Sequence, residues 1–343
     1  MRFDDLFIRG TGVRLPAFLP VADAVAAGDC PPGLAAGADT VSVSVSPDES
    51  PAEMAVGAAR TALERADSGP HDVSLILHAA SYHQGHEMWA VASYLQRETL
   101  RNTCPAIEVR QMSNGGMAAL ELATAYLTSP GRHGDALLTT GDRFCPPGLD
   151  RWRADPGTPF ADGGTALVLS RRGGIARLLS LAVLADAELE ELHRGDVPFS
   201  TSPLPGGRKL DFEGPARAFV KKYGMGFTVT RANAGQQTVV KQALADAEME
   251  LAEADFVLLP HFGKRRLQSI FYRPFGIDPR RTTWEWSRTI GHLGAGDQFA
   301  GLDRLLVSGL VRAGDRIVMM GVGAGYSWGC AVVEILRPPA WPD

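Results

Sequence analysis

The order of predicted elements repeats in the two halves of the chain, and this repeat limits the possible folds more than any other feature. A glycine-bearing turn at Ser113 precedes an apolar helix, an apolar strand that ends in Gly141, and a further strand. A second glycine-rich turn, at His292, precedes an apolar helix, a strand that ends at Gly321, and a further strand. The repeat predicts an α/β fold of two similar halves, with buried sheets and helices on both faces.

The halves are predicted to span residues 1–172 and 173–343. If a pseudo-twofold axis relates them, the two glycine-rich turns face each other across one site. This arrangement would place Ser113 near His292, although the two residues are far apart in the sequence.

Three local predictions accompany this reading. Ser50, followed by Pro51 and Glu53, predicts a capped helix that runs to Ala66. The segment 282–286 is predicted to be extended. The segment 193–214 is rich in Pro, Gly and Ser, which predicts a loop or flap.

Ser113 is the first candidate for chemistry. An extended run, 106–110, leads into its turn, and a helical run, 117–127, leads out. A side chain at such a turn lies at a helix N-terminus, where free N–H groups favour negative charge. A serine there can act as a nucleophile whose oxyanion those groups stabilise. The alternative is that Ser113 only caps its helix.

His292 and Asp297 lie five residues apart on the second turn. A carboxylate at this spacing can fold back on the imidazole, fix its tautomer and stabilise imidazolium, as a base beside a serine requires. The alternatives are that Asp297 caps the following helix and that His292 is a partly buried polar residue bonded to the backbone.

Other candidates are weaker singly. The glycine-rich run 323–329 offers unobstructed N–H groups, so the N–H of Gly325 could join that of Ser113 in an oxyanion hole; an ordinary tight turn is the alternative. His261 follows a buried strand and is either an accessory catalytic residue or a satisfied buried histidine.

Arg151 and Trp152 form a cationic, aromatic spot suited to the phosphate and adenine ring of a substrate. The alternative is a solvated loop. The basic run 264–266 could attract an acidic carrier protein, but a solvated helix face is favoured.

Composition restricts the function classes. The chain has 343 residues, 45% of them hydrophobic and 21% charged, as in globular proteins. A net charge of -5 gives no reason to expect nucleic acid, and no apolar run is long enough for a membrane helix. Four scattered cysteines and an acidic N-terminus without a long apolar segment predict a cytoplasmic protein without a metal site.

Three motifs resemble the ketoacyl-ACP synthase III branch of the thiolase superfamily. The run 323–329, Gly-Ala-Gly-Tyr-Ser-Trp-Gly, is similar to the family's Gly-Gly-Gly-Phe-Thr-Trp-Gly. The run 160–166, Phe-Ala-Asp-Gly-Gly-Thr-Ala, resembles Phe-Gly-Asp-Gly-Ala-Gly-Ala, and 259–261 resembles the start of Pro-His-Gln-Ala-Asn. The resemblance implies a thiolase fold of five layers (αβαβα), a homodimer, and an acyl donor on coenzyme A or on a carrier protein.

Two departures from the family pattern matter more. The family's nucleophilic cysteine falls at Ser113, and its catalytic asparagine falls at His292, whereas its histidine is kept as His261. This set resembles a smaller subgroup with a Ser/Cys-His-Asp triad. Members of that subgroup move acyl groups onto hydroxyls of sugars or aglycones in antibiotic pathways, and others prime aromatic polyketide chains.

The resulting prediction is an acyltransferase. An acyl group passes from a coenzyme A or carrier-protein phosphopantetheine thioester to Ser113, and then to a hydroxyl acceptor, with no further cofactor. A His-Asp pair supplies the base that a hydroxyl acceptor needs. The alternatives are a priming ketosynthase that forms a carbon–carbon bond, and a silent homologue that only binds a carrier protein.

Overall fold

The computed structural model describes residues 1–200, 209–339 and 341. Within these ranges, nine strands form one mixed sheet in the order β5-β4-β6-β7-β1-β8-β11-β10-β9, and β2 and β3 form a small separate ribbon. The strands are β1 (Phe7–Arg14), β2 (Phe18–Pro20), β3 (Ser42–Ser44), β4 (Val73–Ala79), β5 (Ala106–Val109), β6 (Asp135–Asp142), β7 (Gly163–Ser170), β8 (Ala176–Ala185), β9 (Phe256–Leu258), β10 (Arg316–Gly323) and β11 (Ser327–Ile335).

Long and short helices pack on both faces of this sheet. They are α1 (Val21–Ala26), α2 (Pro32–Ala38), α3 (Pro51–Ala66), α4 (Val91–Thr99), α5 (Gly115–Thr128), α6 (Glu191–Arg194), α7 (Glu213–Tyr223), α8 (Met225–Asp246), α9 (Lys264–Leu267), α10 (Arg273–Phe275), α11 (Trp284–Ser287) and α12 (Asp297–Val307).

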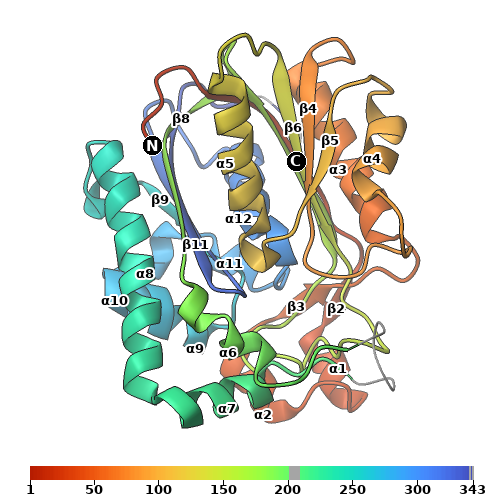
Figure 1. Ribbon diagram of the computed structural model, residues 1–343, viewed down its shortest axis with the longest axis vertical. Coiled ribbons are helices and arrows are strands. Elements are labelled where there is room, and N and C mark those ends of the chain that lie inside the picture. The colour runs from red at the N-terminus through yellow and green to blue at the C-terminus, as the bar shows by residue number, and fades with distance from the viewer. Residues whose placement is uncertain (201–208, 340, 342–343) are drawn as a thin grey trace.

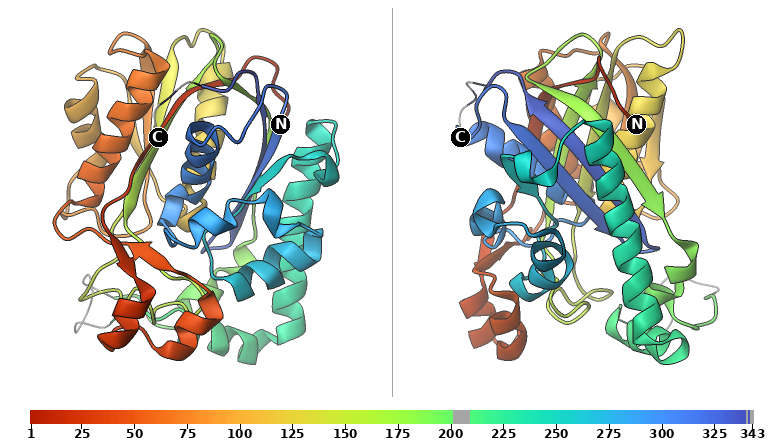
Figure 2. Two further views of the ribbon diagram at one scale, coloured as in Figure 1. Left: turned by 180° about the vertical axis from the view of Figure 1, so that it is seen from behind. Right: turned by 90° about the vertical axis from the view of Figure 1, so that its left-hand side faces the viewer.

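The large sheet is folded into two arms. Strands β1 and β8, where the arms join, are paired through only two residue pairs, Phe7 with Arg177 and Ile8 with Ala176. Figure 1 shows α5 and α12 between the arms, with α3 and α4 outside one arm and α8 outside the other. Figure 2 shows α8 running along the outer face of β8 and β11. The predicted α/β class with five layers is therefore confirmed.

The central layer explains the apolar character of α5 and α12. Leu120 and Ala123 of α5 and Phe299 and Leu302 of α12 are fully buried or nearly so, in one hydrophobic cluster with both arms. A helix that lies between two sheets buries most of its surface, so apolar residues occupy most of its positions. The two predicted apolar helices are in consequence held side by side at the centre of the molecule.

The predicted extended segment 282–286 is wrong beyond its first residue. Thr282 makes a single parallel bridge to Val257 of β9, after which the chain turns into α11. The Thr282 hydroxyl accepts a hydrogen bond from the Trp284 N–H at 3.2 Å, a local bond that competes with strand pairing. The second arm consequently ends at β9. The division of the chain at residues 172 and 173 stays a prediction.

The other two local predictions differ in outcome. The capping box at Ser50 is present, with Pro51 at the first helical position, and α3 ends at Ala66 as predicted. Part of the predicted loop 193–214 is helical, because α6 reaches Arg194 and α7 begins at Glu213. Residues 201–208 of that prediction lie outside the described residues. In the described ranges, no helix combines the length and apolarity needed to cross a bilayer.

Candidate active site

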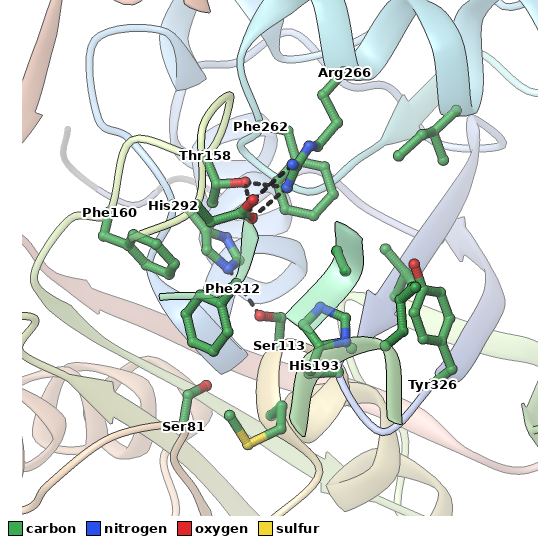
Figure 3. Close-up of a pocket in the computed structure, with 18 of the residues that line it drawn as sticks. Ser81, Ser113, Thr158, Phe160, His193, Phe212, Phe262, Arg266, His292 and Tyr326 are labelled. Carbon is green, nitrogen blue, oxygen red and sulfur yellow. Dashed lines mark hydrogen bonds and ion pairs between the residues drawn. The ribbon is translucent and has the colours of Figure 1, made fainter. Parts of the chain in front are cut away.

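Three polar side chains from the two glycine-rich turns form a hydrogen-bonded chain. The Ser113 Oγ lies 2.8 Å from His292 Nε2, and His292 Nδ1 lies 2.6 Å from Asp297 Oδ2. Figure 3 shows the Ser113 hydroxyl directed at the imidazole of His292. Ser113 precedes α5 in the first half and the other two residues precede or begin α12 in the second, so the structure brings together the predicted triad.

The hydrogen-bond chemistry fixes the tautomer of His292. Asp297 is an acceptor when ionised, so His292 Nδ1 must carry the proton and donate it. His292 Nε2 then has a lone pair and accepts the hydrogen bond from the Ser113 hydroxyl. This is the arrangement in which an imidazole can take a proton from a serine.

The local backbone presents Ser113 on a sharp turn. Met112 has a left-handed conformation, with φ of +50°, a strained state for a residue with a side chain. A short 3₁₀ turn, Met112–Asn114, leads directly into α5. A strained turn between a strand and a helix exposes its side chain, as nucleophile turns do in other folds.

Glycines let the second half come close to this turn. A Cβ on Gly116 would lie 2.6 Å from the carbonyl oxygen of Ala295, and one on Gly323 would lie 2.6 Å from the backbone nitrogen of Asn114. Such contacts exclude any larger residue without movement of the backbone. The Ser113 turn is therefore packed between the loop that carries His292 and the hairpin that joins β10 to β11.

Other groups besides His292 hold the carboxylate of Asp297. Its Oδ2 also accepts the backbone N–H of His261 at 2.7 Å, and its Oδ1 accepts that of Leu293 at 2.8 Å. Burial alone would raise the pKa of Asp297. The nearby His261 and His292 and the hydrogen bonds outweigh burial, and the net pKa lies below the ordinary value. Asp297 is the first residue of α12, but its carboxylate turns to the imidazole and makes no helix cap.

His261 lies behind the triad. Its Nδ1 donates to the Gly291 carbonyl at 3.1 Å and lies 3.5 Å from Asp297 Oδ1. The imidazole packs edge-on against Trp286, and burial lowers its pKa. The next residue, Phe262, takes the place at the cavity wall beside His292. His261 therefore supports the carboxylate of Asp297 and does not face a substrate.

A second buried carboxylate joins the His292 loop to the first half. Asp142 accepts backbone N–H groups from Ser81 at 2.9 Å, Tyr82 at 2.8 Å and Ala295 at 3.3 Å. Burial raises the pKa of Asp142 to about 6, although these hydrogen bonds oppose the shift. A Cβ on Gly294 would lie 2.2 Å from Asp142 Oδ2, so this position also requires glycine. Asp142 thus fixes the position of the His292 loop relative to β4 and β6.

Ser113 and His292 open into a cavity of about 310 Å³. One side is aromatic: the Phe144 and Phe160 rings are 4.7 Å apart, and the Phe160 ring is 5.6 Å from that of His292. The described residues that line the cavity are Ser81, Tyr82, Met112, Ser113, Phe144, Leu149, Asp155, Thr158, Phe160, Leu192, His193, Leu210, Phe212, Ala216, Ala232, Asn233, Gln236, Phe262, Arg266, Ile270, His292, Val322, Gly323, Ala324, Tyr326 and Trp328.

An ion pair forms part of the cavity wall. Arg266 holds both carboxylate oxygens of Asp155 and also contacts the Thr158 hydroxyl (Figure 3). Burial alone would raise the pKa of Asp155, but Arg266 outweighs burial and the net pKa is lowered. Burial alone would lower the pKa of Arg266, but Asp155 outweighs it and the net pKa is raised. The prediction of a solvated face for 264–266 is therefore wrong at Arg266.

The predicted substrate contacts Arg151 and Trp152 have structural roles. Arg151 is paired with the fully buried carboxylate of Asp162 at 3.2 Å and also donates to the Phe160 carbonyl. Trp152 is buried in a hydrophobic cluster with Val21. Neither residue is among those that line the cavity in the described part of the chain. Because a buried carboxylate already holds the guanidinium, Arg151 does not offer it to a substrate phosphate.

The predicted oxyanion donor Gly325 is also misplaced. In the hairpin between β10 and β11, Gly323, Ala324 and Tyr326 line the cavity, whereas Gly325 is not among the described residues that line it. A backbone donor from this turn would accordingly come from the Gly323–Ala324 segment, beside the N–H of Ser113.

Several cavity residues were missed by sequence reasoning. Phe144 and Asp155 lie between the strand that ends in Gly141 and the motif at 160–166, and Phe212 and His193 lie in the predicted flap. Gln236 is on α8, where nothing in its spacing distinguishes it from a structural residue. Aromatic residues inside loops were the sequence signal that could have indicated these cavity residues, because loops seldom bury aromatic rings unless they line a cavity.

A bent sheet that encloses two apolar helices, with the Ser113 turn at the start of one of them, is the architecture of the thiolase-type fold. Residues 244–335 match the family described as 3-oxoacyl-[acyl-carrier-protein (ACP)] synthase III C terminal. The chain belongs to the ketoacyl-ACP synthase III-like family of the thiolase superfamily, and it is an enzyme of that family.

Curated relatives and solved structures agree with this assignment. The chain is 26% identical over 287 residues to the β-ketoacyl-[acyl-carrier-protein] synthase III of Rhizorhabdus wittichii (83% of this chain, 84% of the relative). It is 28% identical over 294 residues to that of Thermosynechococcus vestitus (83% and 84%).

Among solved structures, ChlB3, described as an acyltransferase, superposes with a TM-score of 0.93 and 35% identity, over 98% of this chain and 100% of that one. The 3-oxoacyl-[acyl-carrier-protein] synthase III of Aquifex aeolicus superposes with a TM-score of 0.76 and 22% identity, over 96% and 99%. The second likeness shows the fold alone.

Proposed function

We propose that this protein is an acyltransferase that forms an acyl ester on Ser113 and passes the acyl group to a hydroxyl acceptor. The observation that carries the proposal is the hydrogen-bonded chain from Ser113 through His292 to Asp297 at the edge of a cavity. The donor is a thioester of coenzyme A or of an acyl carrier protein, in keeping with the names of the matched synthases.

In the first half-reaction, His292 Nε2 takes the hydroxyl proton and Ser113 Oγ attacks the thioester carbonyl. The N–H of Ser113 and the backbone of the Gly323–Ala324 turn stabilise the oxyanion. When the tetrahedral intermediate collapses, the carbon–sulfur bond breaks and the proton on His292 passes to the leaving thiolate.

In the second half-reaction, His292 Nε2 takes the proton of the acceptor hydroxyl, whose oxygen attacks the acyl-serine. The ester bond to Ser113 breaks, the proton returns from His292 to the serine oxygen, and the new ester leaves. Asp297 stabilises the imidazolium in both steps through the 2.6 Å contact.

A priming ketosynthase is the second candidate, because the matched relatives carry the name β-ketoacyl synthase. Decarboxylative condensation needs groups at the cavity that stabilise an enolate. In this protein His261 is turned to Asp297 and Phe262 takes the place at the wall, which favours the hydroxyl acceptor. An acyl-serine is also an ester, so its transfer to another hydroxyl is nearly balanced in free energy.

The resemblance to the subgroup with a Ser/Cys-His-Asp triad supports a proposal for the biological setting. We place the protein in the cytoplasm, in secondary metabolism of the antibiotic type, with a sugar or an aglycone as acceptor. We also propose a homodimer. The edge strand β5 ends the sheet, Ile107 on it and Leu122 on α5 are each 50% exposed, and a second copy that paired there would protect this edge.

Intact mass spectrometry tests the proposal. The protein is incubated with a panel of acyl-coenzyme A and acyl carrier protein thioesters, and a mass increase equal to the acyl group is expected. Ser113→Ala is expected to abolish the increase, while Ser93→Ala, an exposed serine on α4, leaves it intact. Label on the Ser113→Ala protein would refute the mechanism, and no label with any donor would favour the silent homologue.

The product separates the two enzyme candidates. An ester of a hydroxyl acceptor, formed without release of carbon dioxide, supports acyl transfer. Carbon dioxide released from a malonyl thioester, together with a new carbon–carbon bond, would support the ketosynthase.

A further inference from the structure

The cavity has a polar side that the proposed chemistry on Ser113 does not use. It is formed by His193, which follows directly on the chain from the apolar wall residue Leu192, by Gln236 of α8, and by Tyr326 of the hairpin after β10. Figure 3 shows His193 beside Ser113, on the opposite side from Phe160, with Tyr326 beyond it. The cavity thus has a polar side and an aromatic side, with the reacting hydroxyl between them.

Two buried polar atoms on this side have no partner among the described residues. They are His193 Nδ1 and Gln236 Nε2. Gln236 is only 5% exposed, so bulk water does not compensate its amide group. A buried donor or acceptor without a partner destabilises a fold, and at a cavity wall a bound molecule can satisfy it.

His193 is suited to bind a hydroxyl group. Burial lowers its pKa; the carboxylate of Asp155 opposes the shift, and Arg266 adds to it. The imidazole is therefore neutral near pH 7, with one N–H and one lone pair, so it can both donate to and accept from a hydroxyl. The ring of His193 lies between those of Phe212, at 5.9 Å, and Tyr326, at 5.4 Å.

These rings indicate the shape of the bound group. Aromatic side chains on both sides of His193 favour a ring-shaped ligand whose face packs against them. The amide of Gln236 supplies a donor beside this space, which matches a hydroxyl or ring oxygen. A small flexible alcohol would leave much of the aromatic surface uncovered.

We propose that His193 and Gln236 form the acceptor subsite, and that the acceptor is a ring-bearing alcohol whose hydroxyl groups they bind. This inference rests on the proposed acyl transfer and assigns its second substrate to one side of the cavity. His193 and Gln236 are specificity-determining residues that hold the acceptor, and His292 remains the base.

The two half-reactions separate this subsite from a role toward the donor. Acyl-Ser113 is first formed with acetyl-coenzyme A, or with the donor that labels best, and the free thiol is removed. Methyl glycosides, cyclohexanol and glycerol are then added in turn, and the loss of the acyl mass and the gain of the ester are followed over time.

In the unaltered protein, a ring alcohol of the panel is expected to speed deacylation saturably beyond the rate in water, and glycerol much less. His193→Phe and Gln236→Leu are each expected to lower the ratio of ring-alcohol deacylation to acylation at least tenfold. Gln237→Leu is the matched control, because it makes the same change at an exposed position of the same helix. Circular dichroism and thermal melting report whether each variant is folded.

Three results would overturn the assignment. One is acylation that falls as much as deacylation in both variants, which would place these residues on the donor. Another is ring-alcohol turnover that neither variant changes. The third is an acyl-enzyme that no ring alcohol of the panel deacylates faster than water does. Each of these requires that acyl-Ser113 forms, so all three differ from failure of the proposed function, in which no acyl-enzyme appears.

Discussion

Asp297→Asn offers the sharpest test of the triad, because the change keeps the size of the side chain and alters only its hydrogen bonding. The carboxylate accepts His292 Nδ1 at 2.6 Å and the His261 N–H at 2.7 Å on one oxygen, and the Leu293 N–H at 2.8 Å on the other. An asparagine amide has a single acceptor oxygen and replaces the other with a donor.

Either orientation of the new amide is unfavourable. If its oxygen faces His292, the NH₂ group meets the Leu293 N–H, and two donors oppose each other. If its NH₂ group faces His292, then Nδ1 must accept and the proton moves to Nε2. The imidazole then donates to Ser113 and can no longer take its proton.

We expect the rate of Ser113 acylation to fall about 10³- to 10⁴-fold, which is roughly 4–5.5 kcal/mol of transition-state stabilisation at 1.36 kcal/mol per tenfold. The free energy of unfolding should change less, by about 1–3 kcal/mol for one buried donor without an acceptor. The catalytic loss is thus expected to exceed the loss of stability.

Quenched-flow mass spectrometry of the acyl-enzyme measures the rate, and thermal melting confirms the folded state. Asp29→Asn, at an exposed position outside the site, is the control and should acylate as the unaltered protein does. Acylation of the Asp297→Asn protein within tenfold of the unaltered rate would show that the carboxylate does not orient the base.

Three further predictions concern stability and packing. Burial raises the pKa of Asp142 to about 6, so the folded state binds an extra proton between pH 4 and 6. In denaturant titrations, the unfolding free energy of the unaltered protein minus that of Asp142→Asn should therefore fall by roughly 3 kcal/mol as pH rises across this window. A difference that does not change with pH would contradict the prediction. Gly116→Ala places a methyl group 2.6 Å from the carbonyl oxygen of Ala295, so it should lower the free energy of unfolding by about 1–3 kcal/mol and slow acylation. The control Gly33→Ala, which lies in open space on α2, should change the free energy of unfolding by no more than about 1 kcal/mol. Equal melting temperatures for the two variants would count against the packing argument. Arg151→Ala removes the cation that is paired with the buried carboxylate of Asp162, which keeps only backbone N–H donors among the described residues. The variant should lose about 3–5 kcal/mol of unfolding free energy by chemical denaturation, with KM for the donor unchanged; a raised KM in a stable variant would restore the substrate role.

The pH prediction needs the difference between variants, because a second group acts in the opposite sense. His78 is buried, and burial lowers its pKa to about 4. The unfolded state then binds the extra proton between about pH 4 and 6.5, so His78 favours stability as pH rises. The total unfolding free energy therefore combines opposing slopes, and the comparison with Asp142→Asn isolates the contribution of Asp142.

The sequence by itself determined the order of elements and the chemistry of the three central residues. Apolar helices after glycine-bearing turns signal burial on all sides, and a capping serine such as Ser50 acts over three residues. These signals are local, because side-chain periodicity and cap hydrogen bonds depend on near neighbours in the chain. The repeat of elements even indicated that Ser113 and His292 face each other, since similar halves can pair about an axis.

Only the tertiary structure decided what each side chain faces. Arg151 and Arg266 both lie in basic, aromatic surroundings in the sequence, yet the first is held by Asp162 away from the cavity and the second forms the cavity wall with Asp155. His261 turned behind the triad because Asp297 and Gly291 hold it. The orientation of such a side chain depends on which residues from distant segments contact it in a closely packed interior, and the local sequence does not specify those contacts.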